Sequence, residues 1–213
     1  MGVPSVRHPH EAFPMADKPR VSVIVPTFNR LELLKECLAA LRHQDYPHYE
    51  IIVVNDCSPD ATQAYLATQP GIHALNLPHN QGTAAARNAG IQAAQGEFVA
   101  FVDDECTMSA DWLSTLMQGF ASRSFVGVGG VVEVRPAGHV SFSNGAVSIH
   151  GEVRPFGATG AGWFPYVCGC NMAFRKRALE AIGLFDPYFR YAYDDSDICV
   201  RLQAAEGKLA CLE

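Results

Sequence analysis

The stretch VSVIVPTFNRLELLKECLAALRHQDYPHYEIIVV, residues 21–54, decides the fold class. It begins with a short, largely β-branched run that ends at Pro26, which is typical of a buried parallel strand. Apolar residues then recur at helical spacing over 31–41, where Asn29 is placed to cap the helix. A second buried run follows at 51–54. A strand, a helix and a strand with short connections predict a right-handed βαβ unit in a parallel sheet.

The alternation of short strands and helices continues along the chain. We expect further strands at 72–77, 98–102 and 167–174, and helices at 58–68, 83–95, 176–182 and 194–205, with one more helix containing Trp112, Leu113, Leu116 and Met117. Residues 135–162 are rich in Gly, Ser, Pro and His, so we expect a long loop or short hairpin that covers the site. The expected fold class is α/β, with a mostly parallel sheet flanked by helices and a flexible leader at 1–20.

The composition indicates a folded domain that does not act on nucleic acid. The chain has 213 residues, 48% of them hydrophobic and 18% charged, which is enough apolar material for one core. The net charge of −6 and the pI of about 5.7 argue against binding by phosphate neutralisation. No run approaches the ~20 apolar residues of a membrane span. The seven cysteines lack zinc-ligand spacing, so we interpret them as reduced intracellular thiols.

Polar residues follow each predicted strand, and they indicate where a ligand would bind. In a parallel α/β sheet, ligands bind beyond the carboxyl ends of the strands. Four groups of polar residues follow the predicted strands, namely Thr27 to Asn29, Asp56, Asn80 to Gly82, and Asp103 to Glu105. These side chains are expected to project from the same edge of the sheet.

Three consecutive acids, Asp103, Asp104 and Glu105, are the most informative group. Carboxylates at the end of a strand suit Mg²⁺ or Mn²⁺, with phosphate oxygens as further ligands, although a solvated turn that caps a helix is the alternative. Asp56 can accept hydrogen bonds from a base or ribose, or it can cap the helix that begins near residue 58. Arg87 can pair with a phosphate or with an acid in a structural ion pair.

A second acidic cluster, Asp194, Asp195 and Asp197, opens the last predicted helix. Acids at a helix start interact favourably with the helix dipole, and a carboxylate beside other carboxylates can also serve as a general base. The Cys168-Gly169-Cys170 pair is weak evidence for a metal site. The motifs G-x-x-x-x-G-K-[ST] and G-x-G-x-x-G are absent, which removes the common nucleotide-loop enzymes.

Taken together, five motifs resemble the family 2 glycosyltransferases. They are VSVIVPTFNR (21–30), IIVVNDCSPD (51–60), Asn80-x-Gly82-x4-Arg87-Asn88-x-Gly90, GEFVAFVDDE (96–105) and Asp194-Asp195-x-Asp197-x3-Arg201-Leu202. The resemblance implies the GT-A fold, which is Rossmann-like, and an inverting reaction that uses a nucleotide-sugar donor, by default a UDP-sugar. It also implies a single domain over 21–213, with a nucleotide-binding half (21–105) and an acceptor-side half (106–213).

The resemblance also implies a role for each matching residue. The implied donor-binding residues are Pro26, Thr27, Phe28, Asn29, Arg30, Asp56, Asn80, Gly82, Arg87, Asp103 and Asp104. The implied ligands of the divalent cation, Mn²⁺ or Mg²⁺, are Asp103, Asp104 and Glu105. Asp195 matches the general base, and Asp194 stands beside it where the family has Glu. Glu105 occupies the last position of the family's DxD motif, one methylene longer than Asp.

The implied partners are a nucleotide-sugar donor and an acceptor that is a saccharide, a lipid-linked saccharide or another hydroxyl compound. The implied location is the cytoplasm, and peripheral association with the inner face of the membrane is left open. A nucleotidyltransferase is one alternative, but it would normally carry a glycine-rich basic loop after the first strand, and residues 26–30 lack glycine. A non-catalytic module that binds sugar nucleotides is the other alternative.

Overall fold

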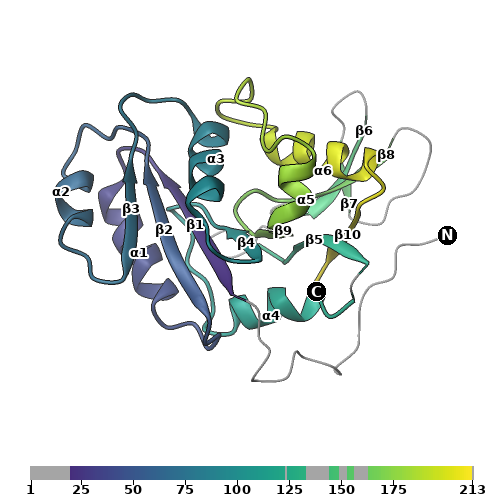
Figure 1. Cartoon of the computed structure of the whole chain (residues 1–213), viewed down its shortest axis with the longest axis horizontal. Coiled ribbons are helices and arrows are strands. Elements are labelled where there is room, and N and C mark those ends of the chain that lie inside the picture. Colours follow the sequence, from purple (N-terminus) through teal and green to yellow (C-terminus); the bar gives the residue numbers. More distant parts are fainter. Residues whose placement is uncertain (1–19, 123, 133–143, 149–152, 156–162, 213) are drawn as a thin grey trace.

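The computed structural model describes residues 20–122, 124–132, 144–148, 153–155 and 163–212 (Figure 1). The strands are β1 Val21–Thr27, β2 Tyr49–Asn55, β3 Ile72–Asn76, β4 Phe98–Phe101, β5 Phe125–Gly129, β6 Asn144–Ser148, β7 Val153–Pro155, β8 Trp163–Val167, β9 Met172–Arg175 and β10 Lys208–Cys211. The helices are α1 Leu31–Leu41, α2 Thr62–Leu66, α3 Thr83–Ala93, α4 Trp112–Gly119, α5 Lys176–Ala181 and α6 Asp194–Ala204.

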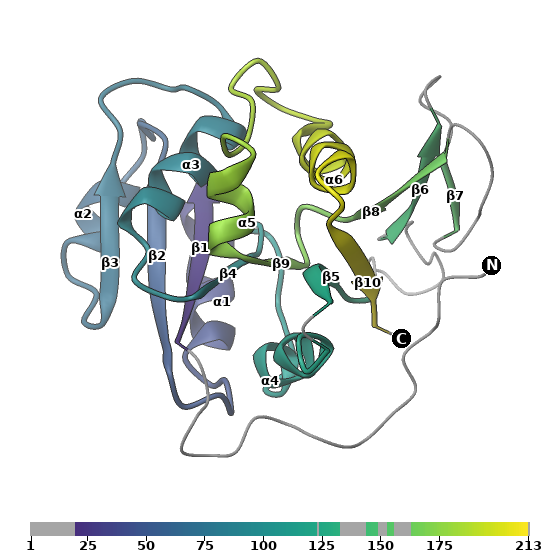
Figure 2. The same cartoon turned by 45° about the vertical axis from the view of Figure 1, so that its right-hand side comes forward.

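Seven strands form one sheet in the order β10-β5-β9-β4-β1-β2-β3. The pairs β1–β2, β1–β4, β2–β3 and β5–β10 are parallel, whereas β9 runs antiparallel to both β4 and β5. The prediction of a mostly parallel α/β sheet is therefore confirmed. A separate three-stranded sheet, β7-β6-β8, lies at the end of the molecule opposite β3 (Figures 1 and 2).

Two apolar layers hold the sheet between helices. Alternate side chains of β1 point to opposite faces, so Val21, Val23 and Val25 pack on one side and Ile24 on the other. The first layer includes α1 and α4, and the second includes α3, α5 and α6. Figure 2 shows α4 on one face of the sheet and α3, α5 and α6 on the other. Because these side chains are fully buried, the sheet edge is a rigid base for the polar residues that follow the strands.

Several predicted boundaries were wrong. The expected strand 167–174 is two strands, β8 and β9, separated by a turn in which the Asn171 amide donates to the Cys168 carbonyl at 2.9 Å. The expected helix 58–68 is reduced to α2. By contrast, the short hairpin that was one of two expectations for 135–162 is supported, because β6 pairs with β7 in an antiparallel fashion. Residues 135–143, 149–152 and 156–162 lie outside the described residues. Of the predicted leader at 1–20, residues 1–19 also lie outside them.

The predicted cap of the first helix was wrong as well. The N-cap residue of α1 is Arg30, and its side chain makes no capping hydrogen bond. Asn29 instead adopts a left-handed backbone with φ of 55°. The Leu31 amide donates to Asp60 Oδ2 at 3.3 Å, so an acid from the next loop supplies the acceptor that the cap would have supplied. Among the described residues, no helix is both long and apolar enough to cross a membrane.

Candidate active site

A cleft of about 700 Å³ opens at the carboxyl edge of β1, β2 and β4. β1 and β2 end in register at Thr27 and Asn55, whereas β4 ends at Phe101, opposite Ile24. Just beyond β1 and β2, the Asp56 amide donates to the Thr27 carbonyl at 2.9 Å. The cleft is lined by Pro26, Thr27, Phe28, Arg30, Asp56, Asn80, Gly82, Arg87, Asp103, Asp104, Glu105, Asp194 and Asp195, together with residues of the 166–170 and 191–193 segments. Asn29 is the one predicted site residue that does not line the cleft, and its backbone amide donates to Ser58 Oγ at 2.9 Å.

Asp56, which directly follows β2, holds the loop before α3 through hydrogen bonds to its backbone. Its two carboxylate oxygens accept from the amides of Gln81, at 2.7 Å, and Gly82, at 2.8 Å. It therefore does not cap α2, where the Thr62 amide is held by Asp60 Oδ1 at 3.0 Å. Asp56 is buried, with 4% of its surface exposed, but it remains part of the cleft lining. The carboxylate thus fixes the loop before α3 in place as one wall of the cleft.

The loop that Asp56 holds is also tied to a distant segment. Gly82 has a φ of +90°, and a Cβ at this position would come within 2.6 Å of the Arg190 carbonyl. The Arg190 guanidinium donates to the carbonyl of Asn80 at 3.0 Å, and the Thr83 amide donates to the Arg190 carbonyl at 2.8 Å. These contacts explain why glycine stands at 82, since both the backbone conformation and the space favour it. They join the loop before α3 to the segment before α6.

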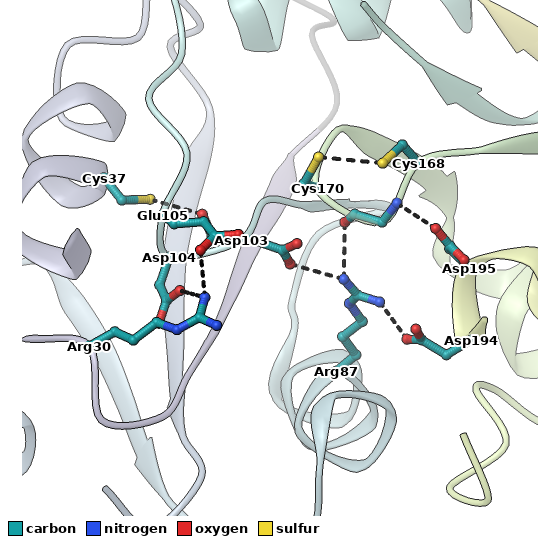
Figure 3. A network of polar contacts seen from close by, with 11 residues as sticks. Arg30, Cys37, Arg87, Asp103, Asp104, Glu105, Cys168, Cys170, Asp194 and Asp195 are labelled. Carbon is teal, nitrogen blue, oxygen red and sulfur yellow. Dashed lines mark hydrogen bonds and ion pairs between the residues drawn. The ribbon is translucent and has the colours of Figure 1, made fainter. Parts of the chain in front are cut away.

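The three consecutive acids are divided between two arginines, with Asp103 on Arg87 and both Asp104 and Glu105 on Arg30 (Figure 3). Asp104 accepts from the Thr27 hydroxyl at 2.7 Å and lies 3.4 Å from the Arg30 guanidinium, which also pairs with Glu105 at 2.8 Å. Asp103 pairs with Arg87 at 3.0 Å. Burial raises the pKa of Asp104, although the Thr27 hydroxyl and Arg30 oppose the shift. Dividing the acids among two arginines and a hydroxyl offsets the repulsion that three adjacent carboxylates would otherwise have.

Arg87 links the two acidic clusters through one buried guanidinium (Figure 3). Its Nη1 donates to Asp194, and its Nη2 donates to Asp103 at 3.0 Å and to the Gly169 carbonyl at 3.1 Å. The arginine is only 2% exposed. Burial lowers the pKa of Arg87, but the charges of Asp103, Asp194 and Asp195 outweigh it and raise the pKa. The predicted ion pair with acids is therefore present, and it joins the two sides of the cleft.

Asp195 lies beside this ion pair at the start of α6. Its Oδ2 accepts from the Gly169 amide at 3.0 Å, and its Oδ1 accepts from the Ser196 amide at 2.7 Å. Burial raises the pKa of Asp195, and the hydrogen bond from Gly169 and the charge of Arg87 partly oppose the rise. A carboxylate that holds a proton more readily than usual is suited to general-base chemistry. Asp197 instead forms an ion pair with Arg201 at 2.6 Å within α6.

Gly169, Tyr191 and Tyr193 also line the cleft, and no functional role was predicted for them from the sequence. Gly169 offers its amide to Asp195 and its carbonyl to Arg87, so only its backbone is used. Tyr191 and Tyr193 are 79% and 68% exposed, and they border the cleft next to α6. The aromatic residues just before the second acidic cluster were a signal for the tyrosines. A glycine that acts through its backbone leaves no such signal.

The acids fit a divalent cation only together with a phosphate ligand. Within the described ranges, no three His, Cys, Asp or Glu side chains are grouped as a complete metal site. However, the side chains of Asp103 and Glu105 are 35% and 54% exposed at the cleft, unlike that of Asp104 at 5%. Mg²⁺ and similar ions are commonly held by one or two carboxylates plus the phosphates of a substrate. The donor set is therefore compatible with a cation that is bound along with a diphosphate.

The family model for glycosyl transferase family 2 matches residues 22–183. The chain therefore belongs to this family of glycosyltransferases. A curated relative, the GalNAc(5)-diNAcBac-PP-undecaprenol beta-1,3-glucosyltransferase of Campylobacter jejuni, is 37% identical over 128 residues, which are 58% of this chain and 41% of the relative. The chain spans less than half the length of the curated relatives that it matches.

Solved structures confirm the expected GT-A fold. The mannosyltransferase PcManGT from Pyrobaculum calidifontis, in complex with GDP-Man and Mn²⁺, aligns with a TM-score of 0.71 and 24% identity over 96% of this chain and 58% of that one. TarS residues 1–349 from S. aureus, in complex with UDP, align with a TM-score of 0.67 and 22% identity over 91% of this chain and 57% of that one. At these identities the likeness supports the fold alone.

Proposed function

We propose that this chain is the catalytic domain of an inverting glycosyltransferase that moves a sugar from a nucleoside diphosphate sugar to an acceptor hydroxyl. The observation that carries the proposal is the cleft in which Arg87 joins Asp103, on the donor side, to Asp194, on the acceptor side. Residues 21–105 would supply the donor half and residues 106–213 the acceptor half. Membership of family 2 supports this assignment.

The nucleoside would bind along the loops after β1 and β2. Pro26, Thr27 and Phe28 line this part of the cleft, and Phe28 is 44% exposed, so its ring is available to a base. The Asp56 oxygens already accept two backbone amides, and a carboxylate has further lone pairs for a base N–H. UDP is our first choice of donor nucleotide, and GDP is the competitor, since the similar folds include one complex with UDP and one with GDP-Man.

The diphosphate would lie against the acidic triplet through a divalent cation, Mn²⁺ or Mg²⁺. Asp103 and Glu105 would hold the cation because their carboxylates are exposed, while Asp104, fixed by Thr27, would orient the donor. When bound, the cation supplies charge stabilisation for the departing diphosphate. Arg30, which is half-exposed beside Glu105, would meet the phosphate oxygens from the other side.

Asp195 would remove the proton of the acceptor hydroxyl as the new glycosidic bond forms. The Gly169 amide and the Ser196 amide hold its two oxygens, which fixes the direction of the carboxylate. Asp194 is committed to Arg87, so Asp195 is the acid of this pair that is left for proton transfer. Single displacement with the base opposite the leaving diphosphate would invert the anomeric carbon.

The acceptor would enter past Tyr191 and Tyr193. Their exposed rings border the cleft next to Asp195 and offer flat surfaces for a pyranose. We propose a saccharide acceptor, free or lipid-linked, because the name of the Campylobacter jejuni relative includes an undecaprenol-linked saccharide. A lipid-linked acceptor would place the enzyme in the cytoplasm, at the inner face of the membrane.

The function is tested by comparing Asp195→Asn with Asp197→Asn. Both replace an acid in the first turn of α6, but only Asp195 lines the cleft, while Asp197 is paired with Arg201. Release of UDP or GDP from a panel of nucleotide sugars is measured with saccharide acceptors, alongside nucleotide affinity. Asp195→Asn is expected to lower kcat by ~10²–10⁴-fold with nearly unchanged nucleotide affinity.

Three results would contradict the proposal. Turnover by Asp195→Asn close to that of the wild type would remove the base assignment. Nucleotide binding by the wild type with no turnover of any donor would instead favour the non-catalytic module. Formation of pyrophosphate from a nucleoside triphosphate would favour the nucleotidyltransferase.

A further inference from the structure

Cys168 and Cys170 flank Gly169, whose backbone is hydrogen-bonded to both Arg87 and Asp195. The Sγ atoms of Cys168 and Cys170 are 3.5 Å apart, and both residues line the cleft (Figure 3). Between them lies Gly169, whose amide donates to Asp195 and whose carbonyl accepts from Arg87. The turn is tight, because a Cβ at position 169 would come within 2.8 Å of Arg87 Nη2. A covalent change in this turn would therefore disturb the hydrogen bonds that Gly169 makes to both charged residues.

We propose that Cys168 and Cys170 form a reversible oxidation site that inactivates the cleft by closing into a disulfide. A disulfide bond is ~2 Å long, so the two sulfurs would have to approach each other by about 1.5 Å. The movement draws the turn together around Gly169. The Gly169 amide and carbonyl are then no longer directed at Asp195 and Arg87. This effect on activity rests on the proposed function, whereas formation of the disulfide does not.

The chemistry requires a peroxide as the oxidant. The thiolate of one cysteine attacks a peroxide oxygen, the O–O bond breaks, and a sulfenic acid and hydroxide are formed. The proton that the thiol released on ionisation converts the hydroxide to water. The second thiol then attacks the sulfenic sulfur, the S–S bond forms, the S–O bond breaks, and a second water leaves. Two thiols are oxidised and one hydrogen peroxide is reduced to two waters. A dithiol reductant reverses the change by thiol–disulfide exchange.

The surroundings favour Cys168 as the attacking thiolate. A hydrogen bond from Cys170 lowers the pKa of Cys168, although burial and the charges of Asp195 and Asp103 oppose the shift. Access is through the cleft, so peroxide can reach the pair without unfolding. A third thiol, Cys106, has its pKa lowered by Cys170, so it lies near enough to be the competing partner for a disulfide.

The sequence makes the two disulfides easy to distinguish by peptide mass. Trypsin leaves residues 124–175 as one peptide because Arg135 and Arg154 precede prolines, and Cys168 and Cys170 are its only cysteines. A disulfide between them removes two hydrogens from this one peptide. A disulfide from Cys106 would instead join it to the peptide of residues 88–123.

The experiment treats the whole chain with hydrogen peroxide and then with dithiothreitol. We expect the 124–175 peptide to lose two hydrogens, amide exchange around residue 169 to become faster, and turnover to fall at least ~10-fold and recover with reductant. In Cys168→Ser and Cys170→Ser, the ratio of turnover after and before peroxide should stay near one. In the matched control Cys57→Ser, an exposed thiol outside the cleft lining, the ratio should fall as in the wild type.

Three results would overturn the proposal. The first is a cross-linked peptide containing Cys106. The second is an unchanged 124–175 peptide at peroxide concentrations that oxidise Cys57. The third is a disulfide in the 124–175 peptide with neither faster exchange near Gly169 nor lower turnover. Because the peptide mass and the exchange rate do not depend on the reaction, a failure of the proposed function is recognised separately, as a wild type without turnover.

Discussion

Breaking the ion pair between Arg87 and Asp194 should destabilise the fold as well as the cleft. The side chains of the two residues are 3% and 6% exposed, so water cannot replace the lost partner. Removing one member of a buried ion pair costs roughly 3–5 kcal/mol. Asp194→Asn keeps the shape and one acceptor oxygen, and Arg87 keeps Asp103 and the Gly169 carbonyl. We therefore expect a loss at the lower end, about 3 kcal/mol.

For a chain of this size, 1 kcal/mol corresponds to ~2–4 °C in melting temperature, so Asp194→Asn should melt about 6–12 °C below the wild type. The assay is thermal unfolding followed by circular dichroism at pH 7. Asp195→Asn is the matched control, since it removes the neighbouring carboxylate without removing the partner of Nη1. A melting temperature of Asp194→Asn within ~2 °C of the wild type would refute the view that this pair stabilises the fold.

Three further substitutions test separate contacts. Gly169→Ala places a Cβ 2.8 Å from Arg87 Nη2, so the guanidinium must shift, and we expect kcat/KM to fall ~10–100-fold in the nucleotide-release assay. Burial raises the pKa of Asp195, so ionising this carboxyl lowers the free energy of unfolding as the pH rises from about 4 through that pKa. In denaturant titrations, the free energy of unfolding of Asp195→Asn should therefore match that of the wild type in acid and exceed it at pH 7. Gly90→Ala places a Cβ 2.5 Å from Ile24 in the α3–β1 packing, and chemical denaturation should show a loss of ~1–3 kcal/mol.

The sequence predicted the first half of the fold well because local patterns specify it. The apolar run at 21–25 and the helical spacing that follows Asn29 correspond closely to β1 and α1. The strands β5 and β10 were not predicted, and neither was the direction of β9. Pairing in this part of the sheet joins Phe125–Gly129 to Lys208–Cys211, far apart in the chain, and no local period records it.

The residues that line the cleft could be predicted from the sequence, but their hydrogen-bond and ion-pair partners could not. All the predicted site residues except Asn29 line the cleft, because residues after parallel strands must meet at one edge. From the sequence, Arg87 could pair with either a phosphate or an acid. The choice depends on where α6 lies, and the sequence does not show that position. The backbone hydrogen bonds of Gly169 could not be predicted, because a glycine contributes no side chain to a motif.

Calorimetric titration of UDP and GDP tests the central claim, that this cleft binds a nucleoside diphosphate through a cation held by Asp103 and Glu105. The titration is run with Mn²⁺ and again after EDTA, with the wild type and with Glu105→Ala. We predict that one of the two nucleotides binds with Mn²⁺, that EDTA weakens the affinity at least ~10-fold, and that Glu105→Ala loses most of the dependence on Mn²⁺. No binding of either nucleotide, or an equal affinity with Mn²⁺ and with EDTA, would contradict the account.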